Sequence, residues 1–212
     1  MFVLSEDLIF PRIELATNDG LLAIGGDLSS ERLLLAYKSG IFPWYSEGQP
    51  ILWWSPDPRF VLFPKDLKVS KSMKKILRNE TFKITYCQQF ERVIEACASM
   101  PRRGQESTWI TVEMKKAYLR LFGLGIAKSV EVWKDGELVG GLYGVDLGHV
   151  FCGESMFSKV SNASKYGFIK FVEKLKCKNY KLIDCQVFTE HLSSLGAVEI
   201  PREEFSKILK SH

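Results

Sequence analysis

Two short segments in the last third of the chain place polar side chains within apolar sequence. Residues 151–154 (FCGE) end in the carboxylate Glu154, and residues 182–187 (LIDCQV) form a buried-type strand that contains Asp184 and Gln186. Side chains two residues apart on a strand face the same side of the sheet. Burying a carboxylate and an amide without hydrogen-bond partners is costly. The pair therefore predicts either a satisfied structural contact or a catalytic pair that holds protons and charge, and the residue types leave both open.

Glu154 follows a predicted β-hairpin. Turn signals at 135–136 and 146–148 bound strands over 137–145 and 148–153, which are expected to pair in an antiparallel manner. Glu154 then falls at the lip of this sheet, where a ligand has access to it. A Gly-rich turn region with an exposed glutamate is the simpler interpretation, and this segment alone does not decide between the two.

A helix is predicted directly after the hairpin, over residues 162–176. Ser161 or Asn162 can cap its first turn by accepting a hydrogen bond from a free backbone amide. The pair at 140–141, two glycines inside the first hairpin strand, marks a bulge or a place where backbone or ligand comes close. One helix face is expected to be buried, because apolar residues recur at a spacing of three to four, at Phe168, Phe171, Val172 and Leu175.

An aromatic segment precedes these elements. Residues 41–60 contain four prolines, three tryptophans and a single glycine, a composition that excludes a regular helix and predicts a rigid loop. Trp53 and Trp54 are interpreted as residues that seal a junction between two lobes. Trp44, which follows Pro43, is the better candidate for a platform on which a base stacks.

The length and composition are those of an ordinary globular protein. The 212 residues are 46% hydrophobic and 25% charged, which allows a sizeable core. The N-terminus lacks the basic flank and apolar run of a signal peptide, and no apolar run approaches the roughly 20 residues that span a bilayer. Five cysteines without a C-x-x-C pair and three scattered histidines form no zinc-binding pattern. We therefore expect a cytoplasmic protein with no membrane contact, no metal and no cofactor.

Charge is distributed unevenly along the chain. Residues 1–63 carry a net charge of −4 and residues 64–212 a net charge of +8. A domain boundary is therefore predicted near residue 63, with a polyanion as partner of the second part. A second basic group begins at Lys165. Basic stripes of this kind either bind a phosphate backbone or are ordinary solvated helix faces. The first stripe has no interleaved acid and consists of Lys68, Lys71, Lys74, Lys75 and Arg78.

Seven strings, in this order, closely resemble the bacterial leucyl/phenylalanyl-tRNA-protein transferases: FPWYSEGQPILWWSPDPR, STWIT, LVGGLYGV, FCGESMFS, NASK, LIDCQV and SLGAVEIPR. The resemblance covers nearly the whole chain. It implies an α+β (mixed α/β) fold with a small N-terminal α+β lobe over 1–63. A larger GCN5-related acyltransferase-like catalytic domain, with a mostly antiparallel central sheet, is then expected over 64–212.

The resemblance also implies a reaction. Leucine or phenylalanine, with methionine as a further candidate, moves from aminoacyl-tRNA to the α-amino group of a protein that begins with Arg or Lys. The new peptide bond marks that protein for degradation by the N-end rule. The implied partners are Leu-tRNA or Phe-tRNA and the acceptor protein. An aminoacyl ester is already activated, so the enzyme has to position the amine, take its proton and stabilise the oxyanion, and no cofactor is required.

The resemblance assigns roles to individual residues. Asp184, Gln186 and Glu154 form the catalytic group. Glutamine is a very poor base, so a positioning or oxyanion role is favoured for Gln186 and the proton acceptor is left open. Glu154 is suited to hold the ammonium group of the aminoacyl end, and with Asp184 and Glu190 it is a candidate for the acidic site that a basic acceptor residue needs. The residues expected to surround the aminoacyl end of the tRNA are Trp44, Trp109, Phe151, Met156 and Phe171. The charge pattern, rather than the resemblance, predicts that the tRNA backbone binds to Lys68, Lys71, Lys74, Lys75, Arg78 and Lys165.

Two other functions stay open at this point. A CoA-dependent N-acetyltransferase on the same fold needs a Q/R-x-x-G-x-G/A loop before the long helix, and residues 161–167 (SNASKYG) lack that pattern. A non-catalytic tRNA-binding module would also carry basic stripes and exposed aromatic residues. Only Glu154, Asp184 and Gln186 argue against such a module.

Overall fold

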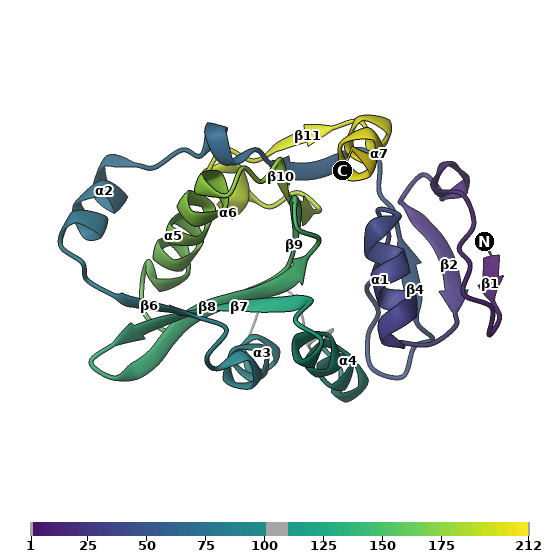
Figure 1. The fold of residues 1–212 in the computed structure, drawn as a ribbon, viewed down its shortest axis with the longest axis horizontal. Helices are drawn as coiled ribbons and strands as arrows, with labels where there is room; N and C mark the ends of the chain where they lie inside the picture. Colours follow the sequence, from purple (N-terminus) through teal and green to yellow (C-terminus); the bar gives the residue numbers. More distant parts are fainter. Residues whose placement is uncertain (1, 101–109, 212) are drawn as a thin grey trace.

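The computed structural model describes residues 2–100 and 110–211, which form two β-sheets and the helices packed on them (Figure 1). The smaller sheet comes from the N-terminal part and has the strand order β1-β2-β4-β3. Trp53 is fully buried in this part, donates its Nε1–H to the carbonyl of Gly25 and meets Phe10 edge-on. It therefore belongs to the packing of the N-terminal sheet. The strands are β1 (Phe2–Leu4), β2 (Leu21–Gly25), β3 (Phe42–Pro43) and β4 (Leu52–Trp54).

The larger sheet has seven strands in the order β11-β5-β10-β9-β8-β7-β6. Neighbouring strands pair in an antiparallel manner, except that β9 and β10 run parallel. The predicted α+β class and the mostly antiparallel central sheet are thus confirmed. The strands are β5 (Arg59–Leu62), β6 (Lys83–Tyr86), β7 (Ala127–Lys134), β8 (Glu137–Asp146), β9 (Val150–Ser158), β10 (Leu182–Gln186) and β11 (Val198–Ile200).

Helices cover both faces of the larger sheet. α5 (Ala163–Cys177) packs on one face, and α3 (Phe90–Ser99) and α4 (Val112–Gly123) cover the other (Figure 1). The first turn of α5 lies so close to β8 that a Cβ on Gly140 would come within 2.8 Å of the Ala163 Cβ. The predicted close approach at this glycine is therefore between two elements of the protein.

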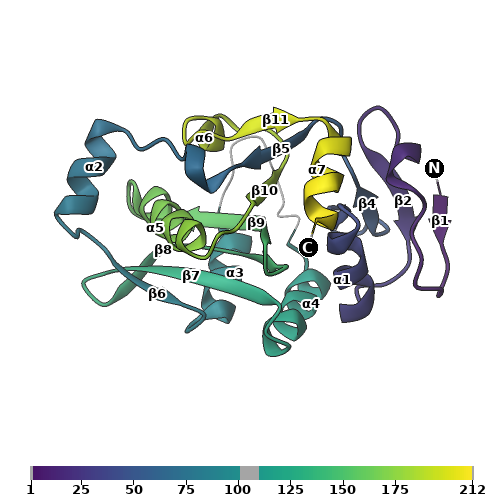
Figure 2. The same cartoon turned by 45° about the horizontal axis from the view of Figure 1, so that its top comes forward.

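The remaining helices lie at the two ends of the larger sheet. α1 (Ser30–Lys38) of the N-terminal part contacts α4, and α7 (Arg202–Lys210) lies beside α1 (Figure 2). Both views place α2 (Lys71–Arg78) at the opposite end of the molecule from α1 (Figures 1 and 2). Short helical segments are α6 (Glu190–Ser193) and the two 3₁₀ turns η1 (Ile13–Leu15) and η2 (Pro64–Asp66).

Three local predictions are corrected by the structure. Residues 41–60 are not a continuous loop, because β3, β4 and the start of β5 lie within them. β9 extends to Ser158, so Glu154 lies inside a strand and not beyond its end. Asn162 precedes α5 with a left-handed φ of 68° and makes no capping hydrogen bond from its side chain, since side-chain capping uses an extended backbone at that position.

The division near residue 63 stays a prediction. β5 lies within the predicted N-terminal lobe, yet it pairs with β10 and β11 of the larger sheet. We propose that the boundary lies just before Arg59.

In the described ranges, 2–100 and 110–211, no helix combines the length and the apolar character that crossing a bilayer requires.

Candidate active site

A pocket opens where β9 and β10 part. These parallel strands are paired only as far as Asp184, which lies opposite Cys152. The register of β10 against β5 then shifts between Asp184 and Gln186, and Gln186 has a φ of 65°. A bulge of this kind re-aims side chains and often lies beside a functional site. It interrupts the regular alternation that the sequence predicted for these two residues.

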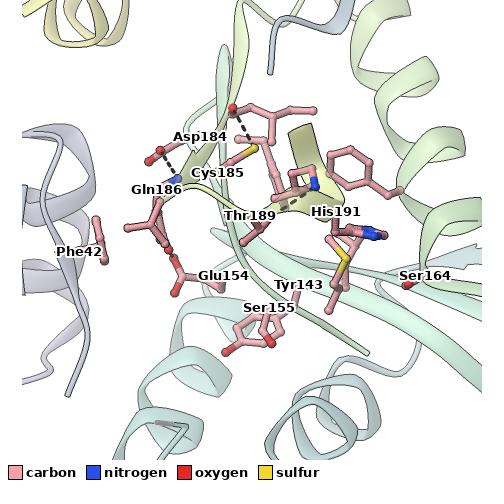
Figure 3. A pocket seen from close by; sticks show the side chains of 18 of the residues that line it. Phe42, Tyr143, Glu154, Ser155, Ser164, Asp184, Cys185, Gln186, Thr189 and His191 are labelled. Carbon is pink, nitrogen blue, oxygen red and sulfur yellow. Dashed lines mark hydrogen bonds between the residues drawn. The ribbon is translucent and has the colours of Figure 1, made fainter. Parts of the chain in front are cut away.

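The pocket has a volume of about 550 Å³. Phe42 borders one end, Ser164 and His191 lie toward the other, and the side chains of Glu154 and Gln186 meet between them (Figure 3). The pocket thus connects the N-terminal part with β9, β10 and the start of α5. Six of the residues predicted for the catalytic and aminoacyl sites line it, namely Glu154, Asp184, Gln186, Trp44, Phe151 and Met156.

Three neutral donors hold the Glu154 carboxylate. The Tyr37 hydroxyl and the Gln186 side-chain amide donate to Oε1 at 2.7 and 2.8 Å, and the Tyr118 hydroxyl donates to Oε2 at 2.8 Å. The two tyrosine oxygens also lie within hydrogen-bonding distance of each other. Each hydroxyl has a single proton, so while both donate to Glu154 neither donates to the other. Because Tyr37 comes from α1 and Tyr118 from α4, two helices from separate parts of the chain converge on one carboxylate.

This environment places the titration of Glu154 near neutral pH. Burial raises its pKa to about 7, against the opposing effect of the hydrogen bonds from Tyr37 and Tyr118, which favour the charged form. A carboxylate accepts up to about four hydrogen bonds, so one acceptor position stays open beside the three donors. Such a group is matched to proton transfer at physiological pH.

Asp184 has a cationic partner instead. Arg59 donates Nε and Nη2 to its two oxygens at 2.8 and 2.7 Å, and both side chains are only 1% exposed. The guanidinium lies over the rings of Phe42 and Phe205 at 4.8 and 4.7 Å, and its Nη1 donates to the carbonyl of Gly40. This ion pair joins β5 and β10 to the chain after α1.

Asp184 also fixes the backbone at the bulge. Its Oδ1 accepts a hydrogen bond from the backbone N–H of Gln186 at 3.0 Å. Both of its carboxylate oxygens are therefore engaged within the protein. Their contacts hold Gln186 in the conformation from which its side chain reaches Glu154.

The predicted aromatic residues take different positions. Trp44 is 37% exposed at the rim, with the ring of Trp54 at 6.1 Å. Phe151 lines the pocket, whereas Phe171 lies behind it and meets the Phe151 ring edge-on at 4.6 Å. Trp109 falls outside the described residues.

None of the six predicted basic residues lines the pocket. Lys165 lies in the first turn of α5 and is close enough to His191 to help lower the pKa of that imidazole, after the larger effect of burial. α2 lies at the end of the molecule far from α1 (Figure 1), and Met73 is its buried residue. Five of the predicted basic residues are exposed, one just before α2 and four on it: Lys68, Lys71, Lys74, Lys75 and Arg78.

Three residues that hold the two carboxylates were not predicted from the sequence. Tyr37 and Tyr118 lie on apolar helix faces, where periodicity predicts ordinary core residues. Arg59 begins a strand of otherwise apolar residues, and a lone arginine there is a weak signal of a buried ion pair. In residues 2–100 and 110–211, no group of three or more histidine, cysteine or acidic side chains is arranged to hold a metal ion.

The fold and the pocket define an α+β protein in which the central sheet parts around a titratable carboxylate. The family model described as leucyl/phenylalanyl-tRNA protein transferase matches residues 61–210, and the model of its N-terminal domain matches residues 26–57. The chain therefore belongs to the leucyl/phenylalanyl-tRNA protein transferase family.

Two relatives with the same family name agree with this assignment. The leucyl/phenylalanyl-tRNA–protein transferase of Flavobacterium johnsoniae is 63% identical over 211 residues, with 100% of both chains covered. That of Christiangramia forsetii is 58% identical over 99% of this chain and 100% of its own. A GCN5-related N-acetyltransferase-like protein from Streptococcus suis aligns with 76% of this chain and 59% of its own at 13% identity, with a TM-score of 0.40.

Proposed function

We propose that this protein transfers leucine or phenylalanine from a charged tRNA to the α-amino group of an acceptor protein that begins with Arg or Lys. Relatives that share more than half of its residues bear the name of this transferase. The observation that carries the chemical part of the proposal is Glu154, a half-buried carboxylate in the pocket whose pKa is raised to about 7.

Glu154 is the proton acceptor in this proposal. The acceptor amine attacks the ester carbonyl carbon, the new C–N bond forms, and the bond between that carbon and the ribose oxygen of the tRNA breaks. The amine loses a proton to the open position on Glu154, and that proton then passes to the departing ribose oxygen. A base whose pKa lies near the working pH performs both transfers efficiently.

Gln186 and Asp184 have supporting roles. The Gln186 side chain lies beside Glu154, where its amide can orient the reactants or stabilise the oxyanion that develops on the carbonyl. Asp184, whose oxygens are engaged by Arg59 and by the Gln186 backbone, acts as a positioning residue. This role agrees with the low exposure of the ion pair.

The pocket wall suits the aminoacyl end. An apolar pocket accepts both leucine and phenylalanine, because a methylene group changes binding by only about 1 to 3 kcal/mol. Trp44 at the rim offers a face for the terminal adenine, and such stacking contributes about 1 to 3 kcal/mol per base. The basic surface of α2, with Lys165, is assigned to the phosphate backbone. The apolar lining includes Leu142, Phe151, Met156, Phe168 and Ile183.

A reconstituted transfer assay tests the proposal. Purified protein, Leu-tRNA and a peptide that begins with Arg should give a Leu-Arg peptide, whereas a peptide that begins with Glu should stay unmodified. An Arg peptide that is unchanged after long incubation with excess protein would favour a tRNA-binding module. Acetylation of the peptide by acetyl-CoA without tRNA would favour the N-acetyltransferase.

A further inference from the structure

One edge of β9 is open within the pocket, and no step of the proposed reaction uses it. β10 pairs with β9 only over Val150–Cys152, whereas β9 continues to Ser158. In residues 2–100 and 110–211, no other strand pairs with this edge beyond Cys152. Among the described residues, a Cβ on Gly153 would meet one atom outside its chain neighbours within 4 Å, the Asp184 carbonyl oxygen at 3.5 Å. The two strands therefore part directly after Cys152.

The backbone of β9 faces the pocket, in addition to its side chains. All six residues from Gly153 to Ser158 line the pocket, although side chains along a strand alternate between the two faces of the sheet. The N–H of Lys159 donates to the carbonyl of Val139 on the β8 side at 2.7 Å. Because hydrogen-bonded and non-hydrogen-bonded residues alternate in an antiparallel pair, Met156 and Ser158 direct their backbone groups to the open edge.

The open edge has a defined length. It begins at Gly153 and ends at Ser158, whose hydroxyl donates to the carbonyl of Val160 and accepts from the N–H of Ser164 in the first turn of α5. At about 3.3 Å per residue, this distance is roughly 16 Å, or about five residues of an extended chain. An open edge presents unpaired N–H and C=O groups and is a template for one more strand.

An extended polypeptide is the occupant whose groups match this edge. Its N–H and C=O groups repeat at the spacing of those on β9, whereas an aminoacyl ester offers a single carbonyl. The apolar residues assigned to the aminoacyl side chain belong to the core under α5 or pack against it, so that side chain leaves the strand edge free.

The two substrates also have separate ends of the pocket. Phe42, two residues before Trp44, borders the end assigned to the terminal adenosine. Ser164 and His191 lie toward the other end and are half-buried, and Glu154 lies between the two ends (Figure 3). A peptide that lies along β9 therefore brings its α-amino group to Glu154 from the side opposite the tRNA.

We propose that the acceptor protein binds by adding its first residues as a strand to the open edge of β9, an inference that rests on the proposed transfer reaction. The α-amino group lies at Glu154, and the main chain runs along β9 toward Ser158 and leaves the pocket past the first turn of α5. Pairing through the main chain does not depend on the side chains after the first residue. Acceptor proteins of different sequence are therefore bound in the same way.

Peptides with one methylated main-chain nitrogen test the strand addition. Methylation removes one N–H and keeps the side chain, and successive N–H groups of a strand point in opposite directions. Of two eight-residue peptides that begin with Arg, one methylated at the third residue and one at the fourth, only one should therefore lose kcat/KM, on the order of tenfold. The unmethylated peptide and one methylated at the eighth residue, beyond the open edge, are the controls. The KM for Leu-tRNA should be the same with all four peptides.

The length of the acceptor gives a second measurement. Extension from Arg amide to a peptide of about five residues, the length of the open edge, should raise kcat/KM on the order of tenfold or more. Further residues should add nothing, because they lie beyond α5.

The outcomes separate the strand addition from the transfer reaction. If the unmethylated peptide is converted and the two methylated peptides lose kcat/KM equally, or neither loses any, the strand addition is wrong and the transferase proposal stands. Equal use of Arg amide and the eight-residue peptide would also overturn the strand addition and would leave the edge of β9 to the aminoacyl end of the tRNA. No product from the unmethylated peptide would contradict the transfer reaction, and the strand addition with it.

Discussion

Two carboxylates line the same pocket and are held in opposite ways. Asp184 lies against the guanidinium of Arg59, with both oxygens occupied and both side chains almost inaccessible. Glu154, on the neighbouring strand, receives only neutral hydroxyl and amide donors. The charge of Asp184 is balanced within the protein by a fixed guanidinium. Glu154 has neutral donors instead, and burial raises its pKa.

This difference indicates which of the two acids is suited to proton transfer. An ion pair can orient its surroundings, and Asp184 does so through the backbone of Gln186. A carboxylate with a pKa of about 7 can exchange a proton at the pH of the cell. The following predictions test this division of roles.

The largest expected effect on turnover follows from Glu154→Gln. The glutamine keeps the shape of the side chain but cannot accept the proton, so the rate of transfer should fall by a factor of about 10² to 10⁴. Binding of Leu-tRNA should persist in a filter or fluorescence assay. A fall of less than tenfold would limit Glu154 to positioning and would break the distinction between the two acids.

Asp184→Asn should act chiefly on stability. It leaves the Arg59 guanidinium buried without a counter-charge, which costs about 3 to 5 kcal/mol of the free energy of unfolding. Urea titration measures this loss. The double variant Arg59→Met, Asp184→Asn is the control, since it removes both charges and should recover part of the stability. If Asp184→Asn lowers the free energy of unfolding by less than about 1 kcal/mol, the ion pair contributes little to stability.

The sequence predicted the type of most elements because their patterns are local. The helix after the hairpin and the strand at 127–133 follow from periodicity and turn residues, and both are present as α5 and β7. Glu154, Asp184 and Gln186 stand out as polar residues in apolar surroundings. The division of roles between them was not predictable, because it depends on Tyr37, Tyr118 and Arg59.

Those three residues are distant from the carboxylates in sequence. Tyr37 and Glu154 are 117 positions apart, and Arg59 and Asp184 are 125 positions apart. No spacing rule connects such positions, and only the packing of α1, α4 and β5 around the pocket brings them together. The bulge at Gln186 is likewise decided by contacts to Asp184 and β5 rather than by the local strand pattern.

The pH dependence of stability should distinguish Glu154 from an ordinary glutamate. Its pKa is about 7 in the folded protein and near 4.5 when unfolded, so the folded state resists ionisation and loses stability relative to the unfolded state as the pH rises from 4.5 to 7. The full difference is about 3 kcal/mol. The Glu154→Gln variant lacks this loss. Its free energy of unfolding, relative to that of the unaltered protein, should therefore increase by this amount between pH 4.5 and 7.5, and a constant difference would contradict the raised pKa.

The smallest effect is expected from Tyr37→Phe, which tests how the neutral donors adjust Glu154. The lost hydroxyl had donated to Oε1 and favoured the charged carboxylate, so the pKa of Glu154 should rise by about one unit. Because the base must be deprotonated, the acidic limb of the pH–rate profile should move to higher pH by the same amount, while the plateau rate at high pH is retained. Tyr45→Phe is the matched control, since its hydroxyl faces Thr111 at 3.5 Å and not Glu154. If Tyr37→Phe lowers the plateau and leaves the limb in place, then Tyr37 acts by holding α1 against α4 rather than through the protonation of Glu154. The distinction between the two acids would then rest on burial alone.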